Sequence, residues 1–282
     1  MRPEIIQAAE MIRRGEIEKA LPLLQNTVFS FSMKVCGHRE DAEDTTQDVL
    51  LKSIRHLAGV EEPKALAVWL YKVTRNRCWM SRRRSKFAPQ HTLSLDELMP
   101  DSEELQSITT NRESTPETQA LSKLESKRVH EAVLRIPPQY RLILVLHDME
   151  DLDTGEVAQI TGLREGTVRV RLHRARLFVR RELAKPSAAK SRKRQRNHKP
   201  VECKRLFAGL SDYIDKRVDD LTCDRIEKHL ADCPPCMAFV NDLSRAVERC
   251  RSLNAPCDSR TAASLQRLLA QELTRLTQAQ PA

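Results

Sequence analysis

The sequence predicts an all-α protein, and three features of its composition and pattern carry that prediction. Glycine is rare, with seven in 282 residues, and aromatic residues make up only 4%. Such a composition disfavours β-sandwiches and Gly-rich nucleotide-binding folds. Apolar residues recur at helical spacing along most of the chain, which indicates amphipathic helices. The length suits two or three small domains, and the short, charge-interrupted apolar runs predict no transmembrane span.

Charge and cysteine usage restrict the classes of partner and compartment. The formal net charge is +9, with 31% charged residues, which favours an anionic partner such as nucleic acid. The first residues, MRPEIIQAAEMIRRGE, include acids and lack an apolar signal-peptide core, so we expect a cytoplasmic protein. In that compartment the eight cysteines are expected to be thiols or metal ligands. Six of them follow residue 200, which predicts a separate C-terminal unit.

Residues 1–86 are expected to form a first helical domain. The stretch EDAEDTTQDVLLKSIRHL places acids in its first turns, where the positive end of a helix dipole favours them. Its apolar residues follow at helical spacing. The next stretch, KALAVWLYKVTRNRCWMSRRRSK, combines an apolar face with arginines in its C-terminal half.

Two linkers of opposite charge divide the rest of the chain. Residues 87–117 hold seven acids, three prolines and one Arg, which predicts an extended acidic linker. Helical patterning resumes over 118–185, with Pro137-Pro138 separating two helices. Residues 186–200 hold six Lys or Arg and no acid, and form a basic linker. Residues 201–282 return to helical patterns and end in an amphipathic helix with a leucine stripe.

The stretch TGEVAQITGLREGTVRVRLHRAR predicts a helix-turn-helix. Ala158 permits close helix crossing, and Gly162 supplies the backbone angles of the turn. A second helix is expected to open at Thr167 with its apolar residues inward. The polar residues expected to face largely outward are Arg169, Arg171, His173, Arg174 and Arg176. Arginine binds both phosphates and guanine edges, so this helix suits the DNA major groove. The alternative is an ordinary surface helix with solvated charges.

Together these segments resemble the extracytoplasmic-function, or group four, sigma factors of bacterial RNA polymerase. GHREDAEDTTQDVLLKSIRHL and AVWLYKVTRNRCWMSRRR are similar to that family's second-region pattern. LRIPPQYRLILVLHDMEDLDTGEVAQITGLREGTVRVRLHRAR is similar to its fourth-region pattern. The resemblance covers roughly residues 10–183 and implies two helical sigma domains, the second ending in the helix-turn-helix.

The resemblance also implies roles for individual residues. The acidic helix would dock on the polymerase clamp through Asp41, Glu43, Asp44, Gln47 and Asp48. The −10 promoter element and its melted strand would meet Trp69, Arg75, Asn76, Arg82, Arg83 and Arg84. The −35 element would be read by the helix-turn-helix through Arg164, Thr167, Arg169, Arg171, His173 and Arg174. Trp69 has an alternative role as a core aromatic in its helical stripe.

The run HLADCPPC, residues 229–236, raises the question of a metal site. On a helix, His229 and Cys233 stand four residues apart on one face, and the two prolines return Cys236 toward the same point. Zinc takes four N or S ligands, so a fourth is needed from Cys203 or Cys223. Six residues before His229, Cys223 would point to the opposite face of a continuous helix. A thiol redox pair or unliganded core cysteines are the alternatives.

A second resemblance bears on this site. VECKRLFAGLSDYIDKRVDDLTCDRIEKHLADCPPCMAFVNDL is similar to the zinc-binding anti-sigma fold over about residues 201–245, which implies a small helical zinc domain. With the C-terminal amphipathic helix, this domain is expected to span residues 201–282. The resemblance implies a structural Zn²⁺ with the ligand set Cys203, His229, Cys233 and Cys236.

The function expected from the sequence is non-catalytic. We expect an alternative sigma factor that binds core RNA polymerase and promoter DNA, with a fused zinc domain that contacts the sigma domains within the same chain. The alternative is a helix-turn-helix repressor or activator that acts without core polymerase. The sequence contains no phosphate-binding loop and no nucleophile–base arrangement, so an enzyme is not expected.

Overall fold

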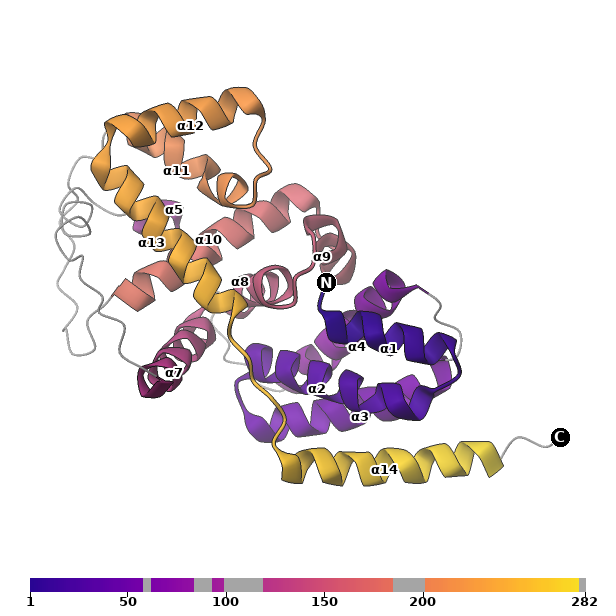
Figure 1. The fold of residues 1–282 in the computed structure, drawn as a ribbon. Coiled ribbons are helices and arrows are strands. Elements are labelled where there is room, and N and C mark those ends of the chain that lie inside the picture. Colours follow the sequence, from indigo (N-terminus) through magenta and orange to yellow (C-terminus); the bar gives the residue numbers. More distant parts are fainter. Residues whose placement is uncertain (58–61, 84–92, 99–118, 185–200, 279–282) are drawn as a thin grey trace. The chain divides into compact units, whose positions relative to one another are not determined.

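The computed structural model describes residues 1–57, 62–83, 93–98, 119–184 and 201–278. All regular secondary structure in these ranges is helical, which confirms the predicted fold class (Figure 1). None of the described helices is long and apolar enough to cross a bilayer. The chain forms two compact units, each assembled from separate stretches of sequence.

The first unit contains residues 1–89, 145–165 and 254–282. Its helices are α1 (Pro3–Arg13), α2 (Ile17–Cys36), α3 (Arg39–Leu57), α4 (Pro63–Arg83), the π-helical turn η1 (Val145–Met149), α9 (Thr154–Thr161) and α14 (Ser259–Gln278). The first four form a bundle in which α2 packs on α1, α3 and α4. Figure 1 shows α14 running alongside this bundle, and it packs on α2 and α3.

The core of the first unit is built from one face of each bundle helix. Phe31 and Tyr71 are almost fully buried, and their ring centroids lie 5.0 Å apart. Leu50 and Leu66 are 0% exposed in the same unit. The predicted apolar faces of α3 and α4 are therefore the faces that pack. Gly37 ends α2 with φ 79°, a left-handed conformation that glycine adopts without a steric penalty.

The second unit contains residues 90–144 and 166–253. Its helices are α5 (Leu95–Leu98), α7 (Gln119–Arg135), α8 (Pro138–Leu144), α10 (Glu165–Ala184), α11 (Val201–Ile214), α12 (Asp220–Asp232) and α13 (Pro234–Arg251). The predicted break at Pro137-Pro138 separates α7 from α8. The edge-on rings of Phe207 and Phe239, 4.8 Å apart, form the core between α11 and α13.

The linkers lie mostly outside the described residues. The basic linker at 186–200 lies outside them completely, whereas the acidic linker is described only over residues 93–98. There the structure departs from an extended segment. Leu95–Leu98 is helical, Leu93 is buried, and the Leu93 backbone N–H donates to the Tyr140 hydroxyl at 3.2 Å. A buried apolar side chain thus anchors this part of the acidic stretch.

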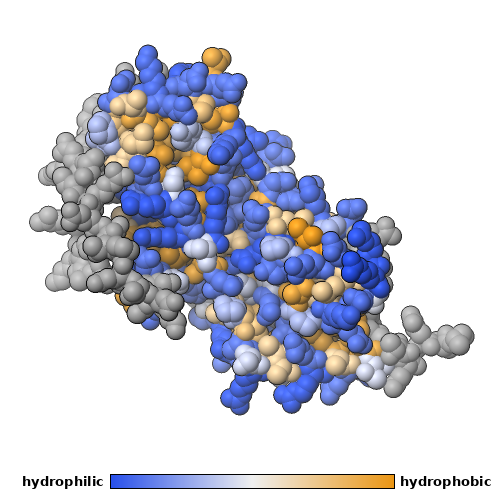
Figure 2. Space-filling view, in the orientation of Figure 1, coloured by the Kyte–Doolittle hydropathy of each residue, from blue (hydrophilic) through white to orange (hydrophobic). Residues whose placement is uncertain are grey.

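Figure 2 shows that one face of the molecule is mostly hydrophilic, with apolar side chains in scattered groups. The large apolar residues of the bundle helices are mainly buried instead. This distribution is that of a globular helical protein whose amphipathic helices turn their apolar faces inward.

Candidate metal centre and nucleic-acid interface

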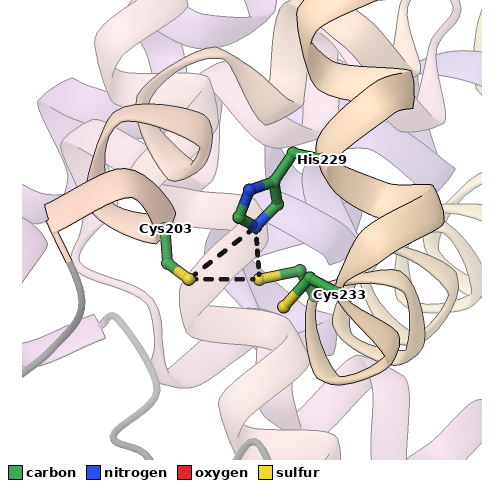
Figure 3. Close-up of side chains that lie close together, drawn as sticks. Cys203, His229 and Cys233 are labelled. Atoms are coloured by element: carbon green, nitrogen blue, oxygen red, sulfur yellow. Dashed lines mark hydrogen bonds between the residues drawn. The ribbon is translucent and has the colours of Figure 1, made fainter.

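Three helices bring a cluster of cysteine and histidine side chains together. Cys203 lies in the first turn of α11 and His229 in the last turn of α12 (Figure 3). Cys236 lies in the first turn of α13. Cys233 is the residue between α12 and α13. The helix α13 begins directly at Pro234. Proline is well suited to this first position, because the N–H that it lacks would have no hydrogen-bond partner within the helix.

The ligand atoms of these four residues all lie within 4.8 Å of one another. The Cys203 Sγ is 3.7 Å from His229 Nε2, and His229 Nε2 is 3.4 Å from Cys236 Sγ. The two sulfur atoms of Cys236 and Cys203 are 3.6 Å apart. The imidazole ring therefore presents its Nε2 to the thiols, as Figure 3 shows.

The three separations among Cys203, His229 and Cys236 fit one face of a tetrahedron around a single metal ion. With Zn–S about 2.3 Å and Zn–N about 2.0 Å, tetrahedral geometry requires S···S edges of about 3.8 Å and S···N edges of about 3.5 Å. The three measured edges agree with these lengths to within about 0.2 Å. The donor set, three sulfurs and one imidazole nitrogen, is also one that zinc prefers and that closes its coordination shell.

Without a bound cation, burial favours the protonated thiols of Cys203 and Cys236 over their thiolates. Desolvation raises the pKa of the Cys203 thiol, and it is also the main cause of the raised pKa of Cys236. A divalent cation would reverse this preference, because thiols that coordinate a metal are deprotonated.

Cys223 lies apart from the cluster. It stands on the same continuous helix as His229, and its Sγ donates to Glu227 Oε1 at 3.5 Å instead. The helical argument that placed Cys223 on the opposite face from His229 is therefore confirmed. None of the eight cysteines, each of which lies within the described residues, forms a disulfide bond.

The helix-turn-helix elements follow the predicted pattern with one shift in a boundary. Asp153 caps α9 in a capping box: its side chain accepts from the Glu156 N–H, and the Glu156 side chain accepts from the Asp153 N–H, each at 2.8 Å. Gly162 ends α9 with φ 72°, as the turn requires. The helix α10 begins at Glu165, two residues before the predicted start at Thr167.

The −35 residues expected on this segment differ in exposure. Arg164, Thr167 and Arg169 are exposed, and Arg171 and Arg174 are half-buried. Thr167, Arg171 and Arg174 line an open groove of about 480 Å³ on α10. Exposed cations near the start of a second helix are available to phosphates and base edges.

The expectation that His173 and Arg176 face outward is wrong. His173 is 7% exposed, and its Nδ1 lies 3.0 Å from the Ser211 hydroxyl on α11. Burial, and then the charges of Arg176 and Arg174, lower the pKa of His173 to about 4. A single amphipathic stripe on α10 predicts that its polar residues face solvent. In the structure, α10 has a second buried face, which packs on α11 and α13.

Arg176 and Arg180 extend this buried face by one helical turn each. Arg176 donates from Nη1 and Nη2 to the two carboxylate oxygens of Asp215, at 2.9 and 2.8 Å. Arg180 donates to Asp242 on α13 at 2.9 Å and stacks over the Phe239 ring at 4.3 Å. Bidentate and stacked arginines are the strong forms of these contacts. No sequence signal assigned Asp215, Asp242 or Ser211 to this role.

The −10 residues expected on α4 are described in part. Trp69 is half-buried with its ring edge-on to His56, Asn76 is exposed, and Arg75 donates to the Ile160 backbone carbonyl at the end of α9. Arg82 and Arg83 are the last two residues of α4, and the structure describes their backbone but not their side chains. Arg84 lies outside the described residues.

The acidic face of α3 lies against the C-terminal helix. Glu43 accepts from the Thr261 hydroxyl at 2.9 Å, and Arg39 pairs with Glu43 and with Asp258. Glu43, Asp44 and Gln47 line a groove of about 380 Å³ together with residues of α14. Asp48 pairs with Arg77 of α4 at 2.6 Å, and Asp41 is half-buried.

Comparison with known families matches three segments of the chain. The model of "Sigma-70 region 2" matches residues 22–87, and that of "Sigma-70, region 4" matches residues 126–179. The model described as "Putative zinc-finger" matches residues 203–237. Two segments of the chain thus match sigma-70 models, and two of its relatives are named as ECF RNA polymerase sigma factors.

Each of three curated relatives matches a little more than half of the chain. The chain is 30% identical over 161 residues to the probable RNA polymerase sigma factor RfaY of Xanthomonas campestris pv. campestris, covering 56% of this chain and 38% of the relative. It is 22% identical to the ECF RNA polymerase sigma factor SigW of Bacillus subtilis, covering 57% and 85%. For SigE of Mycolicibacterium smegmatis the identity is 29%, covering 57% and 59%.

The matched segments contain the candidate site residues. The region 2 match contains the acidic face of α3 and the described −10 residues of α4. The region 4 match contains the residues expected at the −35 element, which lie in the turn after α9 and on α10. The zinc-finger match contains the four ligand candidates of α11 to α13.

Proposed function

We propose that this chain is an alternative sigma factor that binds core RNA polymerase and directs promoter recognition and transcription initiation. The observation that carries the proposal is the presence of regions 2 and 4 in one chain. The relatives are themselves named as RNA polymerase sigma factors. We assign residues 1–86 to the region 2-like domain and residues 118–185 to the region 4-like domain. The role is that of a specificity subunit, without catalysis of its own.

The acidic face of α3 is the proposed polymerase contact. Its carboxylates would meet a basic surface, and such contacts are steered by charge complementarity. The α4 residues Trp69, Arg75 and Asn76 would meet the −10 element, and exposed residues of α10 would meet the −35 element. A repressor that binds only duplex DNA needs neither the acidic α3 face nor the Trp and Arg face of α4, so that alternative is not favoured.

Association with core polymerase is the test. Asp44 is exposed on α3, so Asp44→Arg should remove a favourable charge without disturbing the core. We expect this variant to lose at least tenfold in affinity for core polymerase, and to lose promoter-directed transcription in proportion. Glu10→Arg on the exposed face of α1 is the matched control and should retain wild-type affinity. Absence of any association by the wild-type chain would refute the proposal.

We also propose that Cys203, His229, Cys233 and Cys236 bind one structural Zn²⁺. The tetrahedral spacing and the sulfur-rich donor set support this, and a bound zinc would supply folding energy to the small helical unit around it. Elemental analysis should find about one zinc per chain in the wild type, and much less in Cys236→Ser. Cys223→Ser is the control, because Cys223 lies on α12 outside the cluster. Equal zinc in both variants would exclude this ligand set.

A third part of the proposal concerns regulation within the chain. The zinc-binding helices hold the cations of α10 that would otherwise face phosphates, and α14 covers Glu43 on the proposed polymerase face. We infer that the C-terminal residues restrain the sigma domains in cis. The high effective concentration of a tethered segment favours such contacts.

The α14 contact can be tested separately. Leu265 is 5% exposed on the face of α14 that packs on the bundle, so Leu265→Asp should release the helix. We expect tighter binding to core polymerase for this variant than for Gln266→Asp, whose side chain is exposed. Identical affinities would show that α14 does not compete with polymerase.

A further inference from the structure

A buried polar cluster in the first unit centres on Glu150, in the segment that follows η1. Its carboxylate accepts from Lys34 Nζ on α2 at 2.9 Å and from the Tyr71 hydroxyl on α4 at 2.7 Å. Arg2 lies 3.0 Å from the same carboxylate and donates to the Met149 carbonyl at 2.6 Å. The side chains of Lys34 and Glu150 are both 0% exposed.

The cluster joins residues that are far apart in the sequence and belong to different matched regions. Lys34 and Tyr71 lie in the region 2 match, whereas Glu150 lies in the region 4 match. Immediately after Glu150, the helix-turn-helix begins with α9, which packs on α4. Arg75, a residue expected at the −10 element, donates to the carbonyl of Ile160 in α9. One short segment of region 4 is thus bound to region 2 at both of its ends.

Burial of the Lys34–Glu150 ion pair favours two states of this contact, one fully made and one fully broken. Lys34 is so deeply buried that desolvation lowers the pKa of its amine, and the charge of Glu150 is the main influence that opposes this. Removal of one partner of a buried ion pair leaves the other charge uncompensated, which is far more unfavourable than the pair itself. The segment is therefore either docked with all its bonds made, or released as a whole.

Promoter geometry requires the released state. The two elements take their names from positions −35 and −10, so they lie about 25 base pairs apart, or roughly 85 Å along a duplex at about 3.4 Å per base pair. An α9 helix docked on α4 cannot belong to a region 4 that reads DNA at that distance from region 2. This step rests on the proposed sigma function, whereas the contact itself does not.

We propose that Glu150 is a latch residue, which bonds to Lys34 and Tyr71 in the region 2 match and holds the first helix of the helix-turn-helix on α4 until promoter engagement withdraws it. The latch is made within the sigma half and uses no residue of the zinc-binding helices. It therefore acts as a second restraint in addition to the C-terminal contacts.

Hydrogen exchange of the full-length protein tests the latch. The helix α9 has only eight residues, and helices of that length are marginal without a partner, so undocking should expose its amides. In Glu150→Gln we expect exchange in α9 to rise by roughly 100-fold, because the Lys34 charge loses its compensation. Exchange in the buried turns of α2 and α3 should change by less than about threefold.

Asp151→Asn is the matched control. Asp151 is the next residue, its side chain is 82% exposed, and it pairs with the amino terminus at 2.7 Å. Its φ of 56° is left-handed, a conformation that Asn tolerates as well as Asp. This variant removes the same formal charge from the surface, and α9 exchange should stay within about twofold of wild type.

Tyr71→Phe provides a second, milder variant in case Glu150→Gln does not fold. It removes one hydrogen bond to the carboxylate and keeps the packing against Phe31, so α9 exchange should rise by roughly fivefold. Two results overturn the latch: unchanged α9 exchange in both variants, or an equal rise in α2 and α3, which would make Glu150 an ordinary core residue. The measurement uses neither polymerase nor DNA, so a failure of the sigma proposal would be seen separately.

Discussion

The Asp215–Arg176 ion pair offers a direct test of whether α11 and α13 restrain α10, the proposed DNA-reading helix. Asp215 follows the end of α11 and is 7% exposed at its side chain, and the Arg176 side chain is 0% exposed. Arg176 also donates to the Ser211 carbonyl at 3.2 Å. Asp215→Asn keeps the shape of the side chain but removes its charge and replaces one acceptor oxygen by a donor.

The magnitude follows from burial. Removal of one member of a buried ion pair destabilises by about 3–5 kcal/mol, which is a factor of roughly one hundred to several thousand in the closed-to-open equilibrium. Asp242→Asn is the matched control on the neighbouring contact. Asp242 is 30% exposed, and Arg180 keeps its position over the Phe239 ring, so we expect a loss of about 1 kcal/mol.

Binding to promoter duplex in the absence of polymerase is the assay, measured by fluorescence anisotropy over a range of salt concentrations. Asp215→Asn should bind more tightly than wild type, and Asp242→Asn should fall between them. A released Arg176 that reaches a phosphate should steepen the slope of log K against log salt by about 0.9. Equal affinities and equal slopes in all three proteins would refute the idea that this contact restrains α10.

Three further outcomes are expected. The pKa of His173, about 4, lies below its ordinary value of 6.5, so the folded state binds fewer protons than the unfolded state between these values. The contribution of neutral His173 to stability is therefore full above pH 6.5 and declines toward pH 4. The urea midpoint of His173→Gln should depend less on pH over that range than the midpoint of the wild type. Asp153→Ala removes the α9 capping box and should lower the unfolding free energy by about 1 kcal/mol, whereas Asp153→Ser should retain most of it, as urea titration can determine. A metal chelator should lower the melting temperature and the helical circular dichroism of the wild type, with recovery on addition of zinc, and should leave Cys236→Ser unchanged.

Local signals in the sequence predicted the elements well. Pro137-Pro138, Gly162 and Pro234 mark helix ends by their backbone chemistry alone, and the apolar stripes of α3 and α4 are the faces that pack. The four candidate metal ligands come together as the His229 and Cys233 spacing and the resemblance at Cys203 implied.

Contacts between distant segments were not predictable in the same way. His173 and Arg176 are polar residues at positions that a single amphipathic stripe leaves to solvent, yet α10 has a second buried face. Lys34 and Glu150 are 116 residues apart, and neither lies in a local pattern that indicates burial. Charged residues are buried only with a partner, and a single sequence does not identify partners at that separation.

The four candidate metal ligands also bear on the spacing of two contacts made by α10, the proposed DNA-reading helix. Arg176 and Arg180 stand one turn apart on α10, but their carboxylate partners come from different helices, Asp215 from the end of α11 and Asp242 from α13. The ligand cluster joins the start of α11 to the junction of α12 and α13. It therefore helps to fix the distance between the Asp215 and Asp242 carboxylates that bind α10. By thermodynamic reciprocity, a docked α10 would in turn tighten the hold on a bound ion. Metal binding at the cluster and release of α10 would then be coupled, so that a change in one would shift the other.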